Sequence, residues 1–311
     1  MPESLAYLNG QFLPFSAAML PLNDAGFVWG ATVVDNCRTY AGKLFRWPDH
    51  LSRFRRDCMV CQVPLERSDE KLTAAAERLI ATNRTDSELQ LVTFATPGPL
   101  GFYTGEECDG PPTVGMVTYP IPKKRYRRFF SEGVTLAAAV NPFHQPTHFN
   151  DTFLTPTAKH RSRMAWWVAE RAMGVVGYPP HAVPLFFDRP DGTPTETAFA
   201  NVLVVVDGTV VTPPRHLVLD GISLRFTQEL CSDLRIPFAE AGLDDFHPPN
   251  VTEVMLVGTG FGIAGVREYF SDPKAEAVKF DWPGPIFLRL LTAWSQLVGI
   301  DVQAEFLDSA S

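Results

Sequence analysis

Residues 183–212 read VPLFFDRPDGTPTETAFANVLVVVDGTVVT, and this stretch decides the fold. Two apolar runs, 183–188 and 196–206, flank a Pro-Asp-Gly turn signal, which predicts a β-hairpin. The dipeptide Asp207-Gly208 marks a second tight turn, and the β-branched run 209–212 follows it. We therefore expect the second half of the chain to contain short strands joined by tight turns.

The remainder of the chain mixes helical and strand patterns without a regular order. From Asp49 onward, Leu51, Phe54, Cys58 and Cys61 recur at spacings of three and four residues, which predicts a helix. Similar patterns predict helices over 69–81, 159–173, 223–235 and 283–298, and strands over 5–8, 10–13, 43–45, 89–95, 114–119, 133–140 and 253–257. Because strands and helices do not alternate regularly, the pattern favours an α+β fold in two domains.

Length and charge narrow the class of protein. A chain of 311 residues is longer than one average domain. Lys and Arg number 27 and Asp and Glu number 35, so the net charge of −8 argues against a general nucleic-acid-binding protein. No run approaches the ~20 apolar residues of a membrane span, and the first residues carry no signal-peptide pattern. Five cysteines, an odd number, favour reduced thiols and a cytoplasmic location.

The segment 120–127 is the best candidate for a domain boundary, because proline and charge replace the strand pattern there. We expect an N-terminal α/β domain over 1–119, an inter-domain linker over 120–127 and a C-terminal domain over 128–311. The basic residues in and after this segment are interpreted as a solvated connector. The alternative is a local patch that binds phosphate or nucleic acid.

Two short motifs suggest functions that their surroundings do not support. Cys58 and Cys61 form a C-x-x-C pair, but no second pair accompanies them, so we expect buried structural cysteines and no metal site. Residues 260–265 match the dinucleotide-binding pattern G-x-G-x-x-G. The residues after them look extended rather than helical, so we interpret this segment as a glycine turn whose N–H groups can still bind an anion.

Several polar residues stand at the ends of predicted elements. Lys159 is expected at the start of a helix, and Glu196 opens a strand with Asn201 five residues later. The sequence from Leu219 to Ser223 precedes a helix, whose N-terminus suits a phosphate group. Each of these residues alone is more often a solvated lysine, a surface acid or an ordinary helix cap.

Together and in this order, these residues resemble the class IV, fold-type IV pyridoxal-phosphate enzymes. The resemblance covers nearly the whole chain and rests on Y-L-N-G at 7–10, N-D-A-G-F at 23–27, G-K-L-F-R at 42–46, H-L-S-R-F at 50–54, Lys159, E-T-A-F-A-N-V at 196–202, L-D-G-I-S at 219–223 and E-V-M-L-V-G-T at 253–259. It implies a small N-terminal α/β domain, a larger pseudo-barrel C-terminal domain and a homodimer with the active site near the subunit interface.

The resemblance also implies roles for individual residues toward pyridoxal 5′-phosphate (PLP). Lys159 is the catalytic residue, which forms the Schiff base and transfers the proton, and Glu196 faces the pyridine nitrogen. The remaining cofactor-binding residues are Arg53, Ile222, Ser223, Gly258 and Thr259 for the phosphate, Leu219 for a face of the ring, and Asn201 as support for the strand end.

Other positions bear on the substrate. Arg38 aligns with a position that is often basic and is a candidate carboxylate binder, or else a structural ion pair. Trp29 lines the substrate pocket or belongs to the core. Phe94-Ala95-Thr96 lacks the Arg-x-His pattern of D-amino-acid enzymes, and Met164 replaces the tyrosine of branched-chain enzymes. The roles of His160, Arg161 and Arg163 are left open.

We therefore predict a PLP-dependent aminotransferase that moves an amino group between an amino acid, or an amine, and a 2-oxo acid, as branched-chain aminotransferases do. The alternatives are a β-elimination lyase similar to aminodeoxychorismate lyase, and a transaminase of (R)-amines or D-amino acids. No nucleic-acid or membrane partner is expected.

Overall fold

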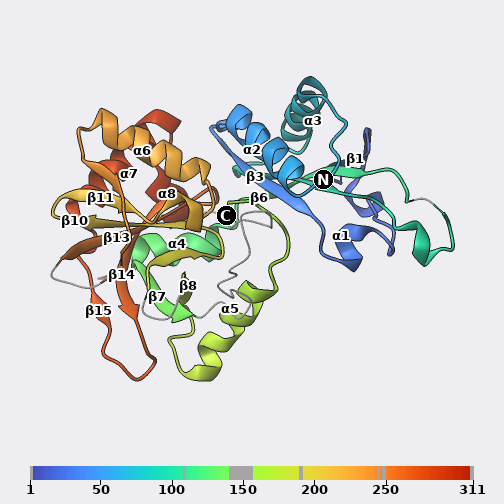
Figure 1. Cartoon of the computed structure of the whole chain (residues 1–311). Helices are drawn as coiled ribbons and strands as arrows, with labels where there is room; N and C mark the ends of the chain where they lie inside the picture. The colour runs from blue at the N-terminus through green and yellow to red at the C-terminus, as the bar shows by residue number, and fades with distance from the viewer. Residues whose placement is uncertain are drawn as a thin grey trace. The chain divides into compact units, whose positions relative to one another are not determined.

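The computed structural model describes residues 3–107, 109–139, 157–188, 192–243, 246 and 250–308, which form two compact units (Figure 1). Unit 1 contains the described residues up to Ile121 together with Ala158–Ser162. Unit 2 contains the other described residues. The sequence expectation had assigned residues 158–162 to the C-terminal domain, whereas their contacts are with unit 1.

Unit 1 is built on an antiparallel sheet of six strands in the order β2-β1-β6-β5-β3-β4. The strands are β1 (Leu5–Leu8), β2 (Gln11–Pro14), β3 (Val33–Tyr40), β4 (Lys43–Leu44), β5 (Leu89–Thr96) and β6 (Thr113–Pro120). Short helical segments, η1 (Phe15–Ala17), α1 (Ala25–Val28) and η2 (Gly101–Tyr103), lie in the connections.

Two helices, α2 (Trp47–Val60) and α3 (Asp69–Thr82), form the core of unit 1 with the sheet. Leu51 and Phe54 of α2 and Leu72 of α3 are at most 4% exposed and pack with Val33 and Leu91 of the sheet. Burial of such side chains stabilises a domain by about 1.5–3 kcal/mol each.

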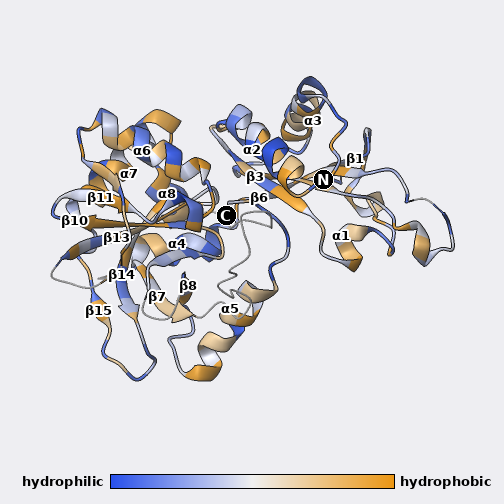
Figure 2. Cartoon of the chain, viewed as in Figure 1, coloured by the Kyte–Doolittle hydropathy of each residue, from blue (hydrophilic) through white to orange (hydrophobic). Residues whose placement is uncertain are grey.

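Unit 2 contains a mixed sheet of nine strands, six of which close into a ring. The strands are β7 (Val134–Ala139), β8 (Val183–Phe187), β9 (Pro194–Thr197), β10 (Asn201–Val206), β11 (Thr209–Thr212), β12 (Phe238–Glu240), β13 (Val251–Gly258), β14 (Gly262–Phe270) and β15 (Val278–Lys279). Neighbouring strands follow the order β10-β13-β14-β7-β8-β9, and β9 pairs again with β10. Hydrophobic residues dominate β10 and β13 (Figure 2). Unit 2 is thus the pseudo-barrel that the resemblance implied, and the α+β prediction is confirmed.

Five α-helices and one 3₁₀ segment accompany the described part of the barrel: α4 (Lys123–Ser131), α5 (Met164–Val176), η3 (Arg215–Leu217), α6 (Ile222–Asp233), α7 (Pro285–Val298) and α8 (Val302–Leu307). α6 packs on β13, and α7 packs on β14. Glu253, a buried residue of β13, accepts hydrogen bonds from the N–H groups of Ile286 (2.9 Å) and Phe287 (2.8 Å). Its carboxylate therefore satisfies the N-terminus of α7, where a negative charge is favoured.

The segment 120–127, expected to be a linker, is the end of β6, a two-residue connection and the beginning of α4. Tyr126, Phe129 and Phe130 of α4 are buried, and their spacing places them on one face of a helix. Three apolar residues among many basic ones thus suffice to fold this helix onto unit 2. The boundary between the two units, at Ile121 and Pro122, falls within the predicted segment, but the basic residues after it form a helix with a buried apolar face instead of a solvated connector.

The two motifs set aside above lie in ordinary structural positions. Gly260 and Phe261 lie in the turn between β13 and β14, and residues 262–265 already belong to β14, so the prediction of a glycine turn followed by extended residues is confirmed. Cys58 is buried, Cys61 is half-buried, and both are free thiols.

Among the helices that the structure describes, none is both long and apolar enough to cross a bilayer.

Candidate active site

Lys159 lies in an extended segment that is hydrogen-bonded to β3, not at the start of a helix as predicted. Its N–H donates to Oδ2 of Asp57 at 2.9 Å, and its carbonyl oxygen accepts from the N–H of Val34 at 3.0 Å. The next residue, His160, forms a β-bridge with Val33. These main-chain bonds hold the segment against unit 1, so α5 begins only at Met164. Lys159 itself is half-buried.

Arg53 belongs to a buried polar cluster inside unit 1. Its Nε and Nη2 atoms both lie 2.8 Å from Oδ2 of Asp35, and Nδ1 of His50 lies 2.6 Å from the other oxygen of that carboxylate. Each of the three residues is at most 3% exposed. His50, Arg53 and Asp57 follow one another at spacings of three and four residues, which places them on one face of α2. That face turns toward Asp35 and Lys159.

The residues of this cluster shift one another's pKa values. Burial acts to raise the pKa of Asp35, but the Arg53 guanidinium, His50 and Lys159 hold it below its usual range. Burial is also the largest effect on His50, and it lowers the pKa of that imidazole. Nδ1 of His50 lies within hydrogen-bond distance of Asp35, so the imidazole orients the carboxylate.

In unit 2, Glu196 and Asn201 close the barrel, and both side chains are hydrogen-bonded to the main chain of Leu219. They form the residue pair that joins β9 to β10. Oε2 of Glu196 accepts from the N–H of Leu219 at 3.2 Å, and Nδ2 of Asn201 donates to the Leu219 carbonyl at 2.9 Å. The sequence 196–206, expected as one strand, is therefore two strands with a tight connection. The motif E-x-x-x-x-N describes both ends of that connection.

The N-terminus of α6 follows directly after Leu219. Gly221 precedes the helix, and a Cβ atom there would lie 2.1 Å from Oδ1 of Asn201, so this position requires glycine. Ile222 and Ser223 occupy the first helical turn and are 2% and 6% exposed. The N–H groups of a first turn have no partner within the helix, and together with a hydroxyl they form a binding site suited to an anion.

Gly258 and Thr259 lie at the same end of the barrel. Asn201 pairs with Val257 in the register of β10 and β13, so the turn after β13 adjoins the connection between β9 and β10. A Cβ atom at Gly258 would come within 2.6 Å of the Phe199 carbonyl oxygen, so glycine is required here too. Thr259 is half-buried in this turn. Leu219–Ser223 and Gly258-Thr259 thus converge on one edge of unit 2.

The structure therefore brings the predicted residues together in two groups. Lys159 and Arg53 lie in unit 1, and unit 2 contains the other cofactor candidates: Glu196, Asn201, Leu219, Ile222, Ser223, Gly258 and Thr259. Asp35, His50 and Asp57 were not predicted as site residues. The polar spacing along a helix with an otherwise apolar buried face is the signal that could have revealed His50 and Asp57.

The two substrate candidates differ in exposure. Trp29 is 62% exposed and stacks on Phe102 with 6.0 Å between the ring centroids, so it is not a core residue. Arg38 is 1% exposed, donates from Nε to the Thr39 carbonyl at 3.0 Å and places its guanidinium carbon 4.0 Å from the centre of the Tyr40 ring.

The three residues whose roles were left open, His160, Arg161 and Arg163, have different surroundings. Nδ1 of His160 accepts from the N–H of Ser162 at 3.2 Å, and Arg161 is exposed. The guanidinium carbon of Arg163 lies 5.7 Å from the centre of the Trp166 ring.

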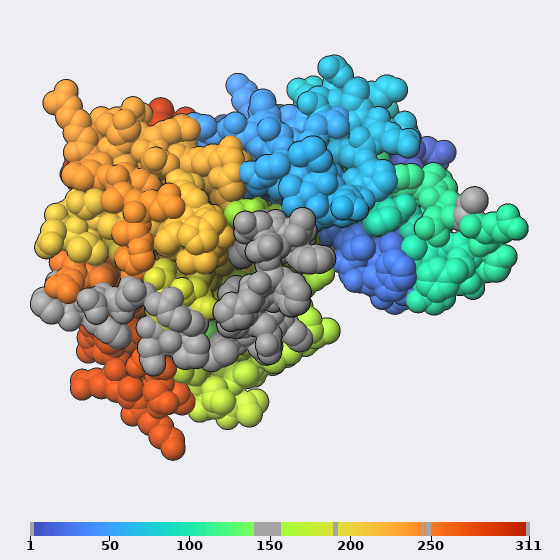
Figure 3. Space-filling view, in the orientation of Figure 1, coloured from blue at the N-terminus to red at the C-terminus, as the bar shows by residue number. Residues whose placement is uncertain are grey.

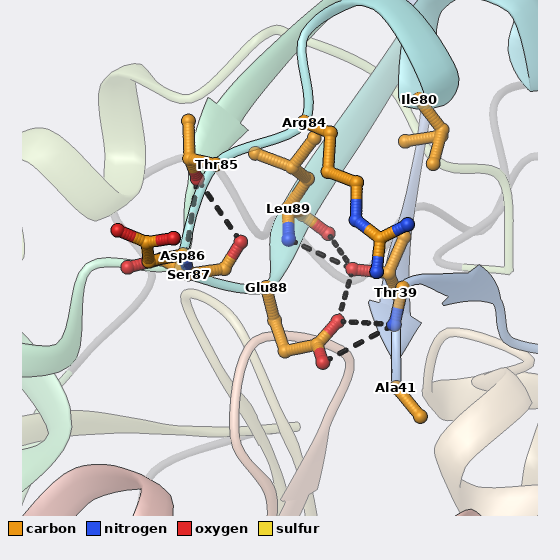
Figure 4. A pocket seen from close by; sticks show the side chains of 10 residues that line it. Thr39, Ala41, Ile80, Arg84, Thr85, Asp86, Ser87, Glu88 and Leu89 are labelled. Carbon is orange, nitrogen blue, oxygen red and sulfur yellow. Dashed lines mark hydrogen bonds between the residues drawn. The ribbon is translucent and has the colours of Figure 1, made fainter.

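A cavity of about 380 Å³ lies elsewhere in unit 1 (Figure 4). It is bounded by the turn between β3 and β4, the end of α3 and the start of β5. The carboxylate of Glu88 inside it accepts hydrogen bonds from the hydroxyl of Thr39 and the N–H of Gly42. None of the residues in the two groups above lines this cavity. Within the described ranges, no cluster of His, Cys, Asp and Glu side chains could hold a metal ion.

Comparison with known proteins identifies the family of this chain. Residues 32–269, more than half of the chain, match the family model described as amino-transferase class IV. The chain belongs to this family. It is 26% identical over 272 residues to D-alanine aminotransferase of Staphylococcus aureus (strain MSSA476), covering 86% of this chain and 89% of that protein.

Two solved structures share the fold. Branched-chain aminotransferase of Thermoproteus uzoniensis with norvaline has a TM-score of 0.77 at 19% identity, covering 95% of this chain and 94% of that one. Branched-chain amino acid aminotransferase of Escherichia coli has a TM-score of 0.76 at 20% identity, covering 95% of each chain. The predictions of the family and of a class IV aminotransferase are confirmed.

Class IV aminotransferases use PLP, and the residues present fit this cofactor. PLP presents an aldehyde, a ring nitrogen and a phosphate dianion. Lys159 provides a primary amine on a segment that is fixed by main-chain bonds, and Glu196 provides a carboxylate oriented by the Leu219 N–H. The first turn of α6 and the hydroxyl groups of Ser223 and Thr259 suit the phosphate.

Proposed function

We propose that this protein is a PLP-dependent aminotransferase that transfers the amino group of a branched-chain amino acid to a 2-oxo acid. The observation that carries the proposal is the setting of Lys159 in a class IV chain. Its N–H and its carbonyl are both hydrogen-bonded to buried groups of unit 1, beside the cluster of Asp35, His50 and Arg53. Fixing the main chain of a reactive group is a common means of positioning it for catalysis.

PLP, when bound, supplies an aldehyde that takes up the amino group and a ring that stabilises negative charge on the substrate carbon. Lys159 would hold the aldehyde carbon through Nζ and then move the proton between the substrate carbon and the cofactor. Glu196 would accept a hydrogen bond from the protonated ring nitrogen. Leu219 would pack on a face of the ring, and Asn201 would keep Leu219 in place.

The phosphate would be held by Arg53, by the N–H groups of Ile222 and Ser223, and by the hydroxyl groups of Ser223 and Thr259. Gly258 would contribute its main chain, since a side chain at this position collides with the Phe199 carbonyl. Arg53 is a suitable member of this set because Asp35 fixes its Nε and Nη2 edge at 2.8 Å and thus restricts its orientation.

Two observations bear on the amino donor. Trp29 and Phe102 offer an exposed aromatic surface, which suits an aliphatic side chain, and the Arg-x-His pattern of D-amino-acid enzymes is lacking at 94–96. These observations favour a branched-chain donor. The 26% identity to a D-alanine aminotransferase favours D-alanine as the second candidate. Arg38, the sequence candidate for the substrate carboxylate, is 1% exposed and stacks on Tyr40, which favours its alternative, structural role.

The test is a set of single-turnover reactions in which the PLP-loaded protein receives one donor and no acceptor. L-Leucine, D-alanine and an (R)-amine are compared, and conversion of the bound cofactor is followed by its visible absorbance. We expect stoichiometric conversion with L-leucine and none in Lys159→Ala. Conversion only with D-alanine or with the (R)-amine would reassign the substrate. No conversion with any donor, combined with release of pyruvate from a β-elimination substrate, would favour the lyase.

A homodimer is also proposed. Trp29, Phe102 and Tyr103 of unit 1 are each more than half exposed and their rings are in contact, and large apolar groups clustered on a surface mark interaction sites. The loop that carries η2 lies at the surface of unit 1 in the space-filling view (Figure 3). Light scattering should give twice the 34.5 kDa of one chain.

A cytoplasmic location is proposed because the four described cysteines are free.

A further inference from the structure

We propose that Asp57 is a positioning residue for Lys159, and that it fixes the main chain of the reactive lysine relative to Arg53. This inference rests on the proposed function and extends it to a residue outside the predicted site. Asp57 and Lys159 are separated by 102 positions in sequence, yet the Asp57 carboxylate accepts the Lys159 N–H at 2.9 Å.

Both carboxylate oxygens of Asp57 are hydrogen-bonded, which fixes the orientation of the side chain. Asp57 is 1% exposed, so its carboxylate depends on protein partners. Its Oδ1 atom accepts from Nε (3.0 Å) and Nη2 (2.9 Å) of Arg56, which leaves Oδ2 directed at the Lys159 N–H. Hydrogen bonds to an ionised carboxylate are roughly twice as strong as neutral ones.

One helix holds two of the proposed functional residues. Asp57 follows Arg53 by one turn of α2, and the Asp35–Arg53 contact binds that helix to β3. β3 in turn donates the Val34 N–H to the Lys159 carbonyl at 3.0 Å. The Lys159 peptide groups are thus held by α2 on the N–H side and by β3 on the carbonyl side. A shift of Lys159 relative to Arg53 would have to break one of these bonds.

Positioning of this kind affects rate more than binding. A small displacement of a reacting group lowers the rate of the chemical step, whereas contacts with the rest of the substrate are unchanged. Loss of the Asp57 bond should therefore lower kcat and leave KM for the donor nearly constant. It should also free the Lys159 N–H for exchange with solvent, because local opening governs hydrogen exchange.

The experiment compares PLP-loaded wild type, Asp57→Ala, Asp57→Asn and the control Asp24→Asn. Asp24 is a matched control because it is also buried in unit 1 and also accepts a main-chain N–H, but that of Gly26 at 2.7 Å rather than that of Lys159. Hydrogen exchange of peptides that contain residues 158–162 is measured by mass spectrometry. The rate of the half-reaction with the donor is measured in parallel.

We expect Asp57→Ala to raise exchange at 158–162 at least about tenfold and to slow the half-reaction roughly tenfold, with KM within about twofold. Asp57→Asn keeps an acceptor oxygen and should show both effects more weakly, and it serves if the alanine variant does not fold. Unchanged exchange at 158–162, or an equal increase in Asp24→Asn, would overturn the proposal. If wild type turns over no donor, the proposed function fails, and the exchange comparison still decides whether Asp57 holds Lys159.

Discussion

Replacing Asp35 by Asn should destabilise unit 1 strongly, because it leaves Arg53 as a buried charge without its carboxylate. Arg53 and Asp35 are 3% and 2% exposed, and their atoms are 2.8 Å apart. Breaking a buried ion pair by removing one partner typically costs about 3–5 kcal/mol. Asn retains an oxygen that can accept from Arg53, and its amide can pair with Nδ1 of His50, but it lacks the negative charge that balances the buried guanidinium. We therefore expect a loss of about 3 kcal/mol at neutral pH.

The assay is urea unfolding followed by circular dichroism, with wild type and Asp35→Asn compared over a series of pH values. The pKa of Asp35 is lowered in the folded protein, so its charge stabilises the fold above the unfolded-state pKa. That contribution is lost as the pH falls through the folded-state pKa. The difference between the two proteins should accordingly be largest at neutral pH and shrink in acid below the ordinary value of 3.8.

Asp49→Asn is the matched control, because Asp49 lies on the same helix but is paired at the surface with Arg46 at 3.3 Å. Its loss should cost less than about 1 kcal/mol. A difference below about 1 kcal/mol for Asp35→Asn at neutral pH, or one that does not shrink in acid, would refute the account of the cluster.

Three further substitutions test other parts of the structure. Glu196→Gln should retain the cofactor, measured by its absorbance, but slow the donor half-reaction about tenfold or more; a wild-type rate would remove the proposed role of Glu196. Glu253→Ala should lower the free energy of unfolding by about 2 kcal/mol, measured in urea, because two N–H groups at the start of α7 lose their buried acceptor. Gly221→Ala should weaken PLP binding in an equilibrium titration, since its Cβ would lie 2.1 Å from Asn201. The control Gly174→Ala, where no atom lies within 4 Å of the added Cβ, should bind PLP normally and gain up to about 1 kcal/mol of stability.

Local patterns in the sequence were sufficient for most strands and helices. The helix predicted over 69–81 is α3 (Asp69–Thr82), and the strand predicted over 209–212 is β11. The first strand of the predicted hairpin is β8, but its partner is β9 (Pro194–Thr197), which overlaps the predicted second run 196–206 only at its start. The predicted turn residues 189–191 lie outside the described residues. For α3 and β11, the apolar period and the turn residues agree with the burial that the fold requires.

The sequence did not predict the contacts that join distant segments. Lys159 has a neighbourhood that looks helical, but its main chain bonds to Asp57 and Val34, which lie more than 100 positions away. No local pattern encodes such a bond. In the same way, Asp35 and His50 read as ordinary polar residues until the fold places them 2.6 Å apart. The catalytic and binding roles assigned to the candidate residues stay predictions.

The closure of the barrel has a consequence for how the protein matures. β9 and β10 are joined through the single residue pair Glu196 and Asn201, so this seam is the weakest line in the ring. If it opens, the edge of β9 becomes available for pairing with other chains, which favours aggregation, whereas β10 stays paired with β11 and β13. A ligand that binds Glu196 stabilises the closed form by mass action. Cofactor supply during synthesis would then determine how much of the chain reaches the native state, as well as how much of it is active.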